Sequence, residues 1–145
     1  MKTTNNTDIT NEMREYFYKR TEKHINRVRE LMMLMEGYET LKRSDLLERG
    51  IAHDQSKYLE PEVTGYIWLS WFHYCKNSNI KFAYPSDTII EMVNNAVDHH
   101  LKSNLHHPES HSNINNMSTL DIVEMVCDWS AISQELNQGS CLNYI

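Results

Sequence analysis

Apolar residues recur at helical spacing along most of this chain, and that periodicity restricts its fold more than any other feature. On a helix with about 3.6 residues per turn, the segment from Asn11 to about Glu36 has one apolar face that includes a histidine. The members of that face are Met13, Phe17, His24, Val28, Leu31 and Met35. The low content of 4 Gly and 3 Pro disfavours a turn-rich β protein. We therefore expect an all-α fold, a single compact bundle of about five main helices.

Local signals place the next two helices. Gly37 is expected to end the first helix, and Ser44 to cap a second one. The expected buried side of this second helix consists of Leu46, Leu47, Ile51 and Ala52. Pro61 suits the first position of a third, aromatic-rich helix that runs to about Lys76.

Two later serines mark the remaining helices. Ser86 is expected to cap the fourth helix, and His100 lies near the centre of that helix's apolar face. The other members of the face are Ile89, Ile90, Val93, Ala96 and Val97. Ser118 is expected to begin the last helix, where the residues up to Asp121 resemble a capping box. Asp121 is therefore assigned a structural role.

Composition limits the class of protein and its partners. A chain of 145 residues suits one domain, which we place at residues 11–137, between a flexible arm (1–10) and a tail (138–145). The net charge of -6 argues against general binding of nucleic acid or of an anionic membrane, since both are bound through excess Lys and Arg. Three distant cysteines favour free thiols in a reducing compartment. With no apolar run near ~20 residues and no secretory signal, we expect a cytoplasmic protein.

The adjacent pair His53 and Asp54 directly follows the second expected helix. It offers a nitrogen and a carboxylate oxygen to one point in space, a combination suited to a divalent transition metal. A single pair of this kind also arises by chance. Lys57, one turn further on, favours a functional interpretation, because it can reach a metal-bound phosphate.

Two other histidines lie on apolar helix faces. A buried His24 must satisfy two ring nitrogens, and two ordinary hydrogen bonds would do this as well as a metal would. His100 repeats the arrangement on the fourth helix, whereas His99 lies at the edge of that face. Taken alone, His24 fits an ordinary core histidine better than a ligand, and a second histidine on a second apolar face weakens that interpretation considerably.

The polar segment from Lys102 to Met117 contains His106, His107 and Glu109. A loop of this length in a compact domain is more often functional or mobile than neutral. The alternative is a solvated loop with incidental histidines. Spacing does not decide whether His106 or His107 is the ligand, and we select His107 because the next residue is a stiffening proline.

Asp128 lies in an acidic strip of the last helix together with Asp121, Glu124 and Glu135. The strip is opposite an apolar face made by Ile122, Val126 and Trp129. Periodicity alone predicts a solvated charged face. The functional interpretation is that the strip borders a metal cavity. Asp128 would then be a ligand, and Glu124 would contact the ligands without binding the metal itself.

Taken in chain order, these residues resemble the HD superfamily of metal-dependent phosphohydrolases, whose minimal signature is a His, an adjacent His-Asp pair and a later Asp on a helical bundle. The positions matching that signature are His24, His53, Asp54 and Asp128. More closely, the segments HDQSK, HHLKSNLHHPE and EMVCDW look like a small family of stand-alone HD-type proteins of bacteria and their viruses, usually described as of unknown function. The resemblance covers roughly residues 16–133, and a viral source would place the protein in the host cytoplasm.

The resemblance implies one or two divalent transition metal ions, with Fe, Mn, Co, Ni and Zn not distinguished. Superfamily members with only the four minimal ligands bind one ion, as 5′-deoxynucleotidases do. Those with further histidines bind two, as HD-GYP phosphodiesterases and myo-inositol oxygenase do. Here His100 and His107, or His106, would serve a second ion. The Gly-Tyr-Pro signature is missing, so the HD-GYP substrate is not carried over.

The function implied is hydrolysis of a small, nucleotide-like phosphate ester. Asp54 would bridge two ions, Lys57 would contact the phosphate, and Glu109 or an unligated histidine would protonate the leaving oxygen. His106 and Glu124 would orient the ligands or contact substrate. The alternatives are an HD-type di-iron oxygenase and a non-catalytic protein that binds nucleotides. The sequence leaves the substrate, the metal and a homo-oligomeric state open.

Overall fold

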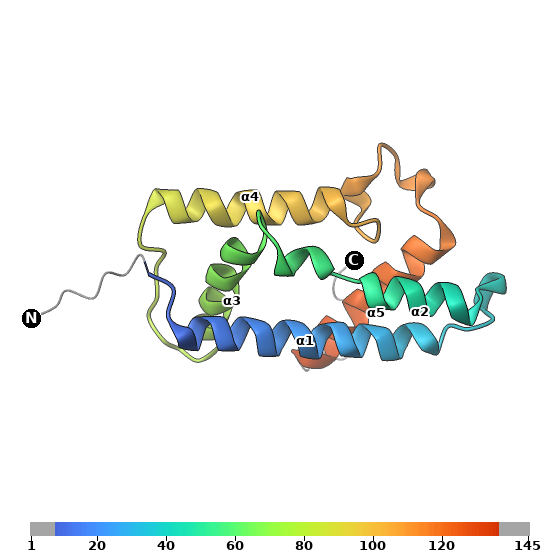
Figure 1. The fold of residues 1–145 in the computed structure, drawn as a ribbon, viewed down its shortest axis with the longest axis horizontal. Helices are drawn as coiled ribbons and strands as arrows, with labels where there is room; N and C mark the ends of the chain where they lie inside the picture. The colour runs from blue at the N-terminus through green and yellow to red at the C-terminus, as the bar shows by residue number, and fades with distance from the viewer. Residues whose placement is uncertain (1–7, 137–145) are drawn as a thin grey trace, which may run out of the picture. The chain divides into compact units, whose positions relative to one another are not determined.

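The computed structural model describes residues 8–136, and within them it contains five α-helices and no strand. The helices are α1 (Asn11–Met33), α2 (Arg43–Ala52), α3 (Val63–Asn77), α4 (Asp87–Ser103) and α5 (Thr119–Glu135) (Figure 1). Four short 3-10 turns connect them: η1 (Tyr38–Thr40), η2 (Gln55–Tyr58), η3 (Pro108–Ser110) and η4 (Ile114–Asn116). The expected all-α class is confirmed. The expected tail, Cys141 and most of the expected arm lie outside the described residues.

The chain divides into two compact units. Unit 1 takes the residues up to Arg20 and Ser56–His100, and unit 2 takes Thr21–Gln55 and the residues from Leu101 onward. Each unit has its own apolar core. The expected domain boundaries, residues 11–137, stay a prediction.

Unit 1 packs the start of α1 against α3 and α4. Its buried apolar side chains are Met13, Phe17, Ile67, Trp68, Ile89 and Val93. Gly65 lets α3 approach α4 closely, since a Cβ at this position would lie 2.4 Å from the Cβ of Ala96 and 2.9 Å from the carbonyl oxygen of Met92. Of the aromatic side chains of α3, Trp68 belongs to this core, and Tyr66 and Trp71 pack against it.

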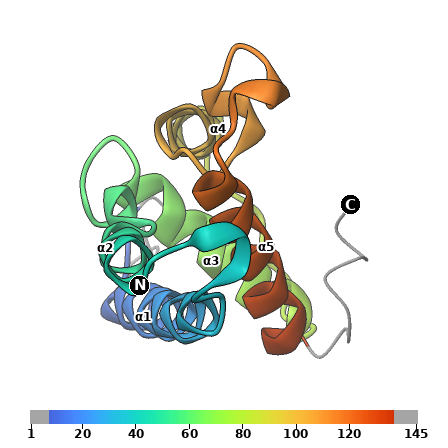
Figure 2. The same ribbon diagram turned by 90° about the vertical axis from the view of Figure 1, so that its right-hand side faces the viewer.

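Unit 2 packs the later part of α1 against α2 and α5. Its buried apolar side chains are Val28, Met32, Leu46, Val123, Cys127 and Ala131. In Figures 1 and 2, α2 folds back along the C-terminal part of α1. The guanidinium of Arg29 joins the two helices: Nε donates to the carbonyl oxygen of Gly50 at 3.0 Å and Nη2 to that of Ile51 at 3.2 Å. This cation satisfies carbonyls at the C-terminal end of α2, where the helix dipole is negative.

The expected buried face of α2 is only partly right. Leu46 is buried, but Leu47 and Ile51 are about half exposed, at 50% and 53%, and Ala52 is exposed as well. The second buried residue of the helix is Gly50, because the side chain of Arg29 covers it. An apolar face deduced from hydropathy alone cannot include a glycine that lies under an arginine.

Two of the signals at the helix ends were correct and three were wrong, among them Pro61, which lies two residues before the start of α3 at Val63. Ser86 Oγ accepts from the backbone N–H of Ile89 at 3.3 Å, and Ser118 and Asp121 form the expected capping box. The expected cap at Ser44 is wrong, because α2 begins at Arg43, with Lys42 in the N-cap position. The first helix ends at Met33, before the expected Glu36.

Gly37 adopts a φ of +87° in the turn that follows α1. Glycine reaches this left-handed conformation without steric cost, which explains its position in the connection to α2.

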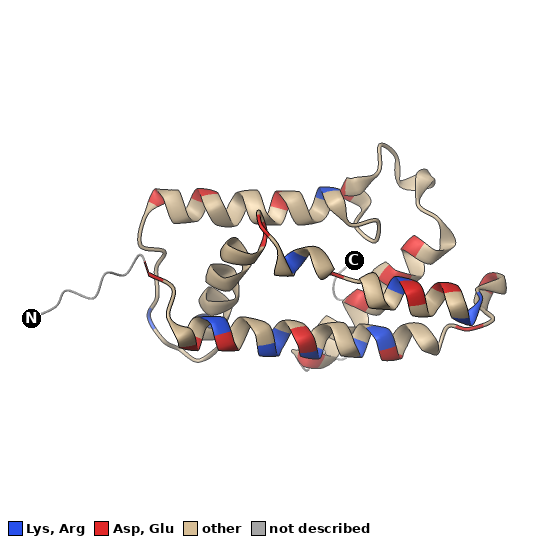
Figure 3. Cartoon of the chain, viewed as in Figure 1, with Lys and Arg blue, Asp and Glu red and all other residues tan. Residues whose placement is uncertain are grey.

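The surface charge, the thiols and the lengths of the helices add three facts. Acidic and basic residues are interspersed along α1 and α2 (Figure 3). Cys75 and Cys127 are free, buried thiols, in agreement with the expectation from their spacing. Among the described helices, none is long and apolar enough to cross a membrane.

Candidate metal centre

Four side chains from three helical segments of unit 2 converge on one point. Each offers a ligand atom, and these atoms all lie within 4.8 Å of one another. The four are His24, His53, Asp54 and Asp128. Asp54 and His53 are each 1% exposed, so the group is closed off from bulk solvent on their side.

The backbone around the His-Asp pair explains how two adjacent residues face the same point. His53 is the C-cap residue of α2, and Asp54 then adopts the left-handed conformation with a φ of +55°. Aspartate tolerates this conformation better than most residues with a side chain. The helix therefore ends at the pair, where His24 from α1 and Asp128 from α5 approach it.

The spacing of the donor atoms fits a metal ion. His24 Nε2 lies 2.8 Å from Asp128 Oδ1, 3.4 Å from His53 Nε2 and 3.6 Å from Asp54 Oδ2. His53 Nε2 lies 3.3 Å from Asp128 Oδ1 and 3.4 Å from Asp54 Oδ2. With metal–ligand bonds of about 2.1 Å, neighbouring ligand atoms are about 3.0–3.4 Å apart. Two imidazoles and two carboxylates are also a donor set that suits divalent transition metals.

The electrostatics show why the group is stable as a set of ion pairs. Burial opposes a charge on His53, but the charge of Asp54 and hydrogen bonds with Asp128 and Glu124 outweigh it and raise the His53 pKa to about 10. Burial likewise opposes a charge on His24, yet its hydrogen bonds with Asp128 and Asp54 raise the pKa of His24. The same contacts hold the pKa of Asp128 well below its usual range, against the effect of burial. The carboxylates thus favour cations at this point.

A further cluster of possible ligands shares His53 with this group. His53, His106 and Glu124 are all buried, and they also place one ligand atom each within 4.8 Å of one another. Glu124 Oε2 lies 2.6 Å from His53 Nδ1 and 3.1 Å from His106 Nδ1. Burial would raise the pKa of Glu124, but hydrogen bonds from His106 and His53 outweigh it and lower the pKa to about 2.

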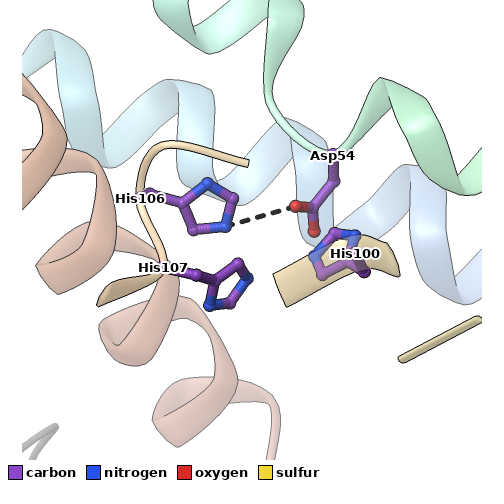
Figure 4. A group of neighbouring side chains, drawn as sticks. All are labelled: Asp54, His100, His106 and His107. Carbon is purple, nitrogen blue, oxygen red and sulfur yellow. Dashed lines mark ion pairs between the residues drawn. The ribbon is translucent and has the colours of Figure 1, made fainter. Parts of the chain in front are cut away.

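The second oxygen of Asp54 faces the loop histidines. Asp54 Oδ1 lies 3.3 Å from His106 Nε2, the ion pair drawn as a dashed line in Figure 4. His107 belongs to the same group of possible ligands, and its ring centroid lies 4.1 Å from that of His106. Both histidines thus lie close to Asp54. The ring of His106 contacts both Asp54 and Glu124. The selection of His107 as the ligand stays a prediction.

His100 belongs to unit 1, where it is buried, as its place on the apolar face of α4 predicted. Its Nδ1 lies 2.8 Å from Oε1 of Glu62, and His99 Nδ1 lies 2.6 Å from Oε2 of the same carboxylate. Burial would raise the pKa of Glu62, but these hydrogen bonds, with a further one to Ser56, lower it. The role of His100 as a metal ligand stays a prediction.

The two other predicted catalytic residues lie as follows. Lys57 is in η2, in unit 1, with Nζ 5.0 Å from the ring centroid of Tyr66. Glu109 is exposed in the turn η3. Their contacts with a substrate stay predictions.

The acidic strip of α5 faces inward, which reverses the expectation from periodicity. Asp121, Glu124 and Asp128 are all buried, and only Glu135 of the strip is exposed. Ile122 and Val126, on the expected apolar face, are instead 43% and 40% exposed. Ion pairs explain the reversal, because carboxylates with cationic partners can be buried.

Sequence reasoning missed two of the side chains that contact these carboxylates. Arg49 Nη1 lies 2.7 Å from Asp121 Oδ1 and 2.9 Å from Glu124 Oε1. His111 is a second omission: its Nε2 lies 3.5 Å from Asp121 Oδ2. The spacing of Arg49 and His53, four residues apart along α2, was a usable signal, because it places both side chains on the same side of the helix.

The comparisons with known proteins give a family and no function. The chain matches no curated protein and no solved structure. One family model matches residues 13–144, which is nearly the whole chain. The chain therefore belongs to the family of unknown function DUF5662.

Proposed function

We propose that this protein is a metal-dependent phosphohydrolase of HD type that acts on a small, nucleotide-like phosphate ester. One observation carries the proposal: four buried or half-buried side chains, far apart in sequence, bring ligand atoms within 4.8 Å of one another. They follow the chain order of the HD signature, as His24, His53, Asp54 and Asp128. The donor distances and the donor types suit a divalent ion.

A bound divalent ion would supply two things, a water whose pKa is lowered toward about 7 and positive charge opposite the phosphoryl oxygens. The protein supplies the rest. His24, His53 and Asp128 would hold the ion together with Asp54 Oδ2. Asp54 Oδ1 faces His106, so the same carboxylate can also serve a second ion.

The remaining roles concern the substrate. Lys57 would contribute a positive charge to the phosphate, as its place three residues after Asp54 suggested. Glu109, or a histidine that holds no ion, would protonate the leaving oxygen. The net charge of -6 does not oppose an anionic substrate, because a metal ion dominates the field close to it.

A di-iron oxygenase is the second candidate, and one observation favours it. A histidine-rich group with His106 and His107 adjoins Asp54, so the donors for a two-ion site are present. Iron in such a site, open to oxygen, would serve oxidation rather than hydrolysis. A non-catalytic protein that binds nucleotides is the third candidate.

A single screen separates the three candidates. Protein stripped with a chelator is reloaded separately with Mn²⁺, Fe²⁺, Co²⁺, Ni²⁺ and Zn²⁺ and incubated with nucleotides and phosphodiesters, in air and without oxygen. Phosphate release that requires metal but not oxygen supports the hydrolase. Turnover that requires iron and oxygen selects the oxygenase, and nucleotide binding without turnover selects the binding protein. A chain that takes up no metal refutes the proposed centre.

A further inference from the structure

The carboxylate of Glu124 lies at the centre of a polar chain that runs through unit 2. One oxygen, Oε2, contacts two rings, at 2.6 Å from His53 Nδ1 and 3.1 Å from His106 Nδ1. The other oxygen, Oε1, lies 2.9 Å from Nη1 of Arg49. A single side chain of α5 thus joins α2 to the loop that follows α4.

These contacts determine which nitrogen of each ring carries a proton. An ionised carboxylate only accepts hydrogen bonds, so His53 and His106 must both donate from Nδ1 to Glu124. Each ring then presents Nε2 to the other side, where His53 Nε2 lies 3.4 Å from Asp54 Oδ2 and His106 Nε2 lies 3.3 Å from Asp54 Oδ1. One carboxylate oxygen therefore directs two rings toward the two oxygens of Asp54.

Arg49 restricts the rotation of that carboxylate. Its Nη1 contacts Glu124 and, at 2.7 Å, Asp121 Oδ1. Asp121 is itself held by the capping box with Ser118, in which Asp121 Oδ2 accepts from the Ser118 N–H at 2.9 Å. The side chains of Glu124 and Asp121 are only 3% and 6% exposed, so neither is free to exchange Arg49 for bulk water.

We infer that Arg49 and Glu124 form a positioning pair that orients the imidazoles of His53 and His106 together, so that both present Nε2 toward Asp54. The inference rests on the proposed function, in which those nitrogens face a metal ion. Partners behind metal ligands fix the ring orientation and raise the basicity of the ligand. Here one partner serves two rings, and an arginine that contacts neither ring holds that partner in place.

The first test needs no metal. In chain labelled with ¹⁵N-histidine and stripped of metal, we expect slowly exchanging Nδ1–H resonances from His53 and His106, each assigned by its loss in His53→Ala or His106→Ala. They stand beside the Nδ1–H signals of His99 and His100, which bond Glu62. Glu124→Gln should lose the resonances of His53 and His106 together while its backbone spectrum keeps the dispersion of a folded protein. Glu62→Gln is the matched control, because Glu62 accepts from the Nδ1 atoms of His99 and His100. It should leave the resonances of His53 and His106 unchanged.

The second test uses Zn²⁺ alone. Glu124→Gln should weaken Zn²⁺ binding about 10–100-fold. Arg49→Met should weaken it in the same direction, and Arg49→Lys should recover part of the loss, because the lysine keeps a positive charge near Glu124. Glu36→Gln, which removes an exposed carboxylate 4.0 Å from Arg43, is the control and should bind as the wild type does.

Each contrary result has its own meaning. Both Nδ1–H resonances persisting in Glu124→Gln, or only one of them disappearing, would overturn the shared orientation of the two rings. Equal Zn²⁺ affinity in wild type and Glu124→Gln would overturn the positioning role alone. A wild type that binds no Zn²⁺ would instead refute the metal centre of the proposed function, and the positioning role with it.

Discussion

His24 Nε2 and Asp128 Oδ1 lie 2.8 Å apart, although 104 residues separate them in sequence. The contact joins α1 to α5 within unit 2, and His53 and Asp54 at the end of α2 complete the group. An acid and a base brought together from opposite ends of a chain are costly to bury without a compensating partner. In this protein His24 and Asp128 are each other's partner. The group of ligand atoms to which both belong also suits a divalent cation.

Asp128→Asn should weaken metal binding by at least about a hundredfold, because it replaces a charged ligand and leaves His24 without its closest acceptor. Glu135→Gln is the matched control, since Glu135 is seven residues further along α5 and exposed. Isothermal titration with Mn²⁺ or Zn²⁺ measures both. Equal losses in the two variants would mean that net charge, rather than the cluster, governs binding.

Metal affinity should rise with pH. The pKa of His53 is raised to about 10 and that of His106 to about 9, so below these values the folded protein holds protons that a metal must displace. The affinity should therefore increase between about pH 6 and 8, and uptake at pH 7 should release about two protons if His24 and His53 both bind. Titration in two buffers of different ionisation enthalpy counts these protons. Affinity that does not change with pH would contradict the assignment.

Arg49→Met should destabilise the metal-free protein by about 2–4 kcal/mol, because it leaves two buried carboxylates, Asp121 and Glu124, without their arginine. Arg43→Gln is the control, since its ion pair with Glu36 is 4.0 Å long and exposed, and it should cost less than about 0.5 kcal/mol. Urea denaturation in the presence of chelator measures both. Similar costs for the two variants would show that Arg49 is only a surface charge.

Gly65→Ala should destabilise unit 1 by about 1–3 kcal/mol, because the new Cβ would lie 2.4 Å from the Cβ of Ala96. Gly37→Ala provides a contrast of a different kind, since at Gly37 a Cβ has nothing within 4 Å but the φ is +87°. There the cost should come from backbone strain alone, about 1 kcal/mol. Thermal unfolding compares the stabilities of the two variants. A Gly65→Ala protein as stable as wild type would mean that α3 and α4 are further apart at Gly65 than in the structure.

Much of the fold could be predicted because its signals are local. The capping serines Ser86 and Ser118, and the burial of His100 among the apolar residues of α4, each follow from neighbours within one or two helical turns. The pair of His53 and Asp54 could be predicted as part of the site for the same reason, because its two members are adjacent in sequence.

The orientation of α5 could not be predicted in this way. Hydropathy places Ile122 and Val126 inside, yet they are exposed, while Glu124 and Asp128 are buried. The reversal depends on cations that come from distant segments, such as Arg49 and His53, and no local periodicity contains that information. The contribution of Arg49 to the site therefore became visible only when α2 and α5 were seen together.

The most direct test of the proposed function is elemental analysis of protein purified without added metal or chelator, followed by a phosphate-release assay on the same sample. Wild type should contain about one or two divalent ions per chain and release phosphate from a nucleotide-like ester. His53→Ala and Asp54→Ala should lose metal and activity together, whereas His73→Ala, a histidine of unit 1 outside the cluster, should keep both. Normal metal content and turnover in either cluster variant, or a wild type that stays metal-free after reloading, would contradict the assignment.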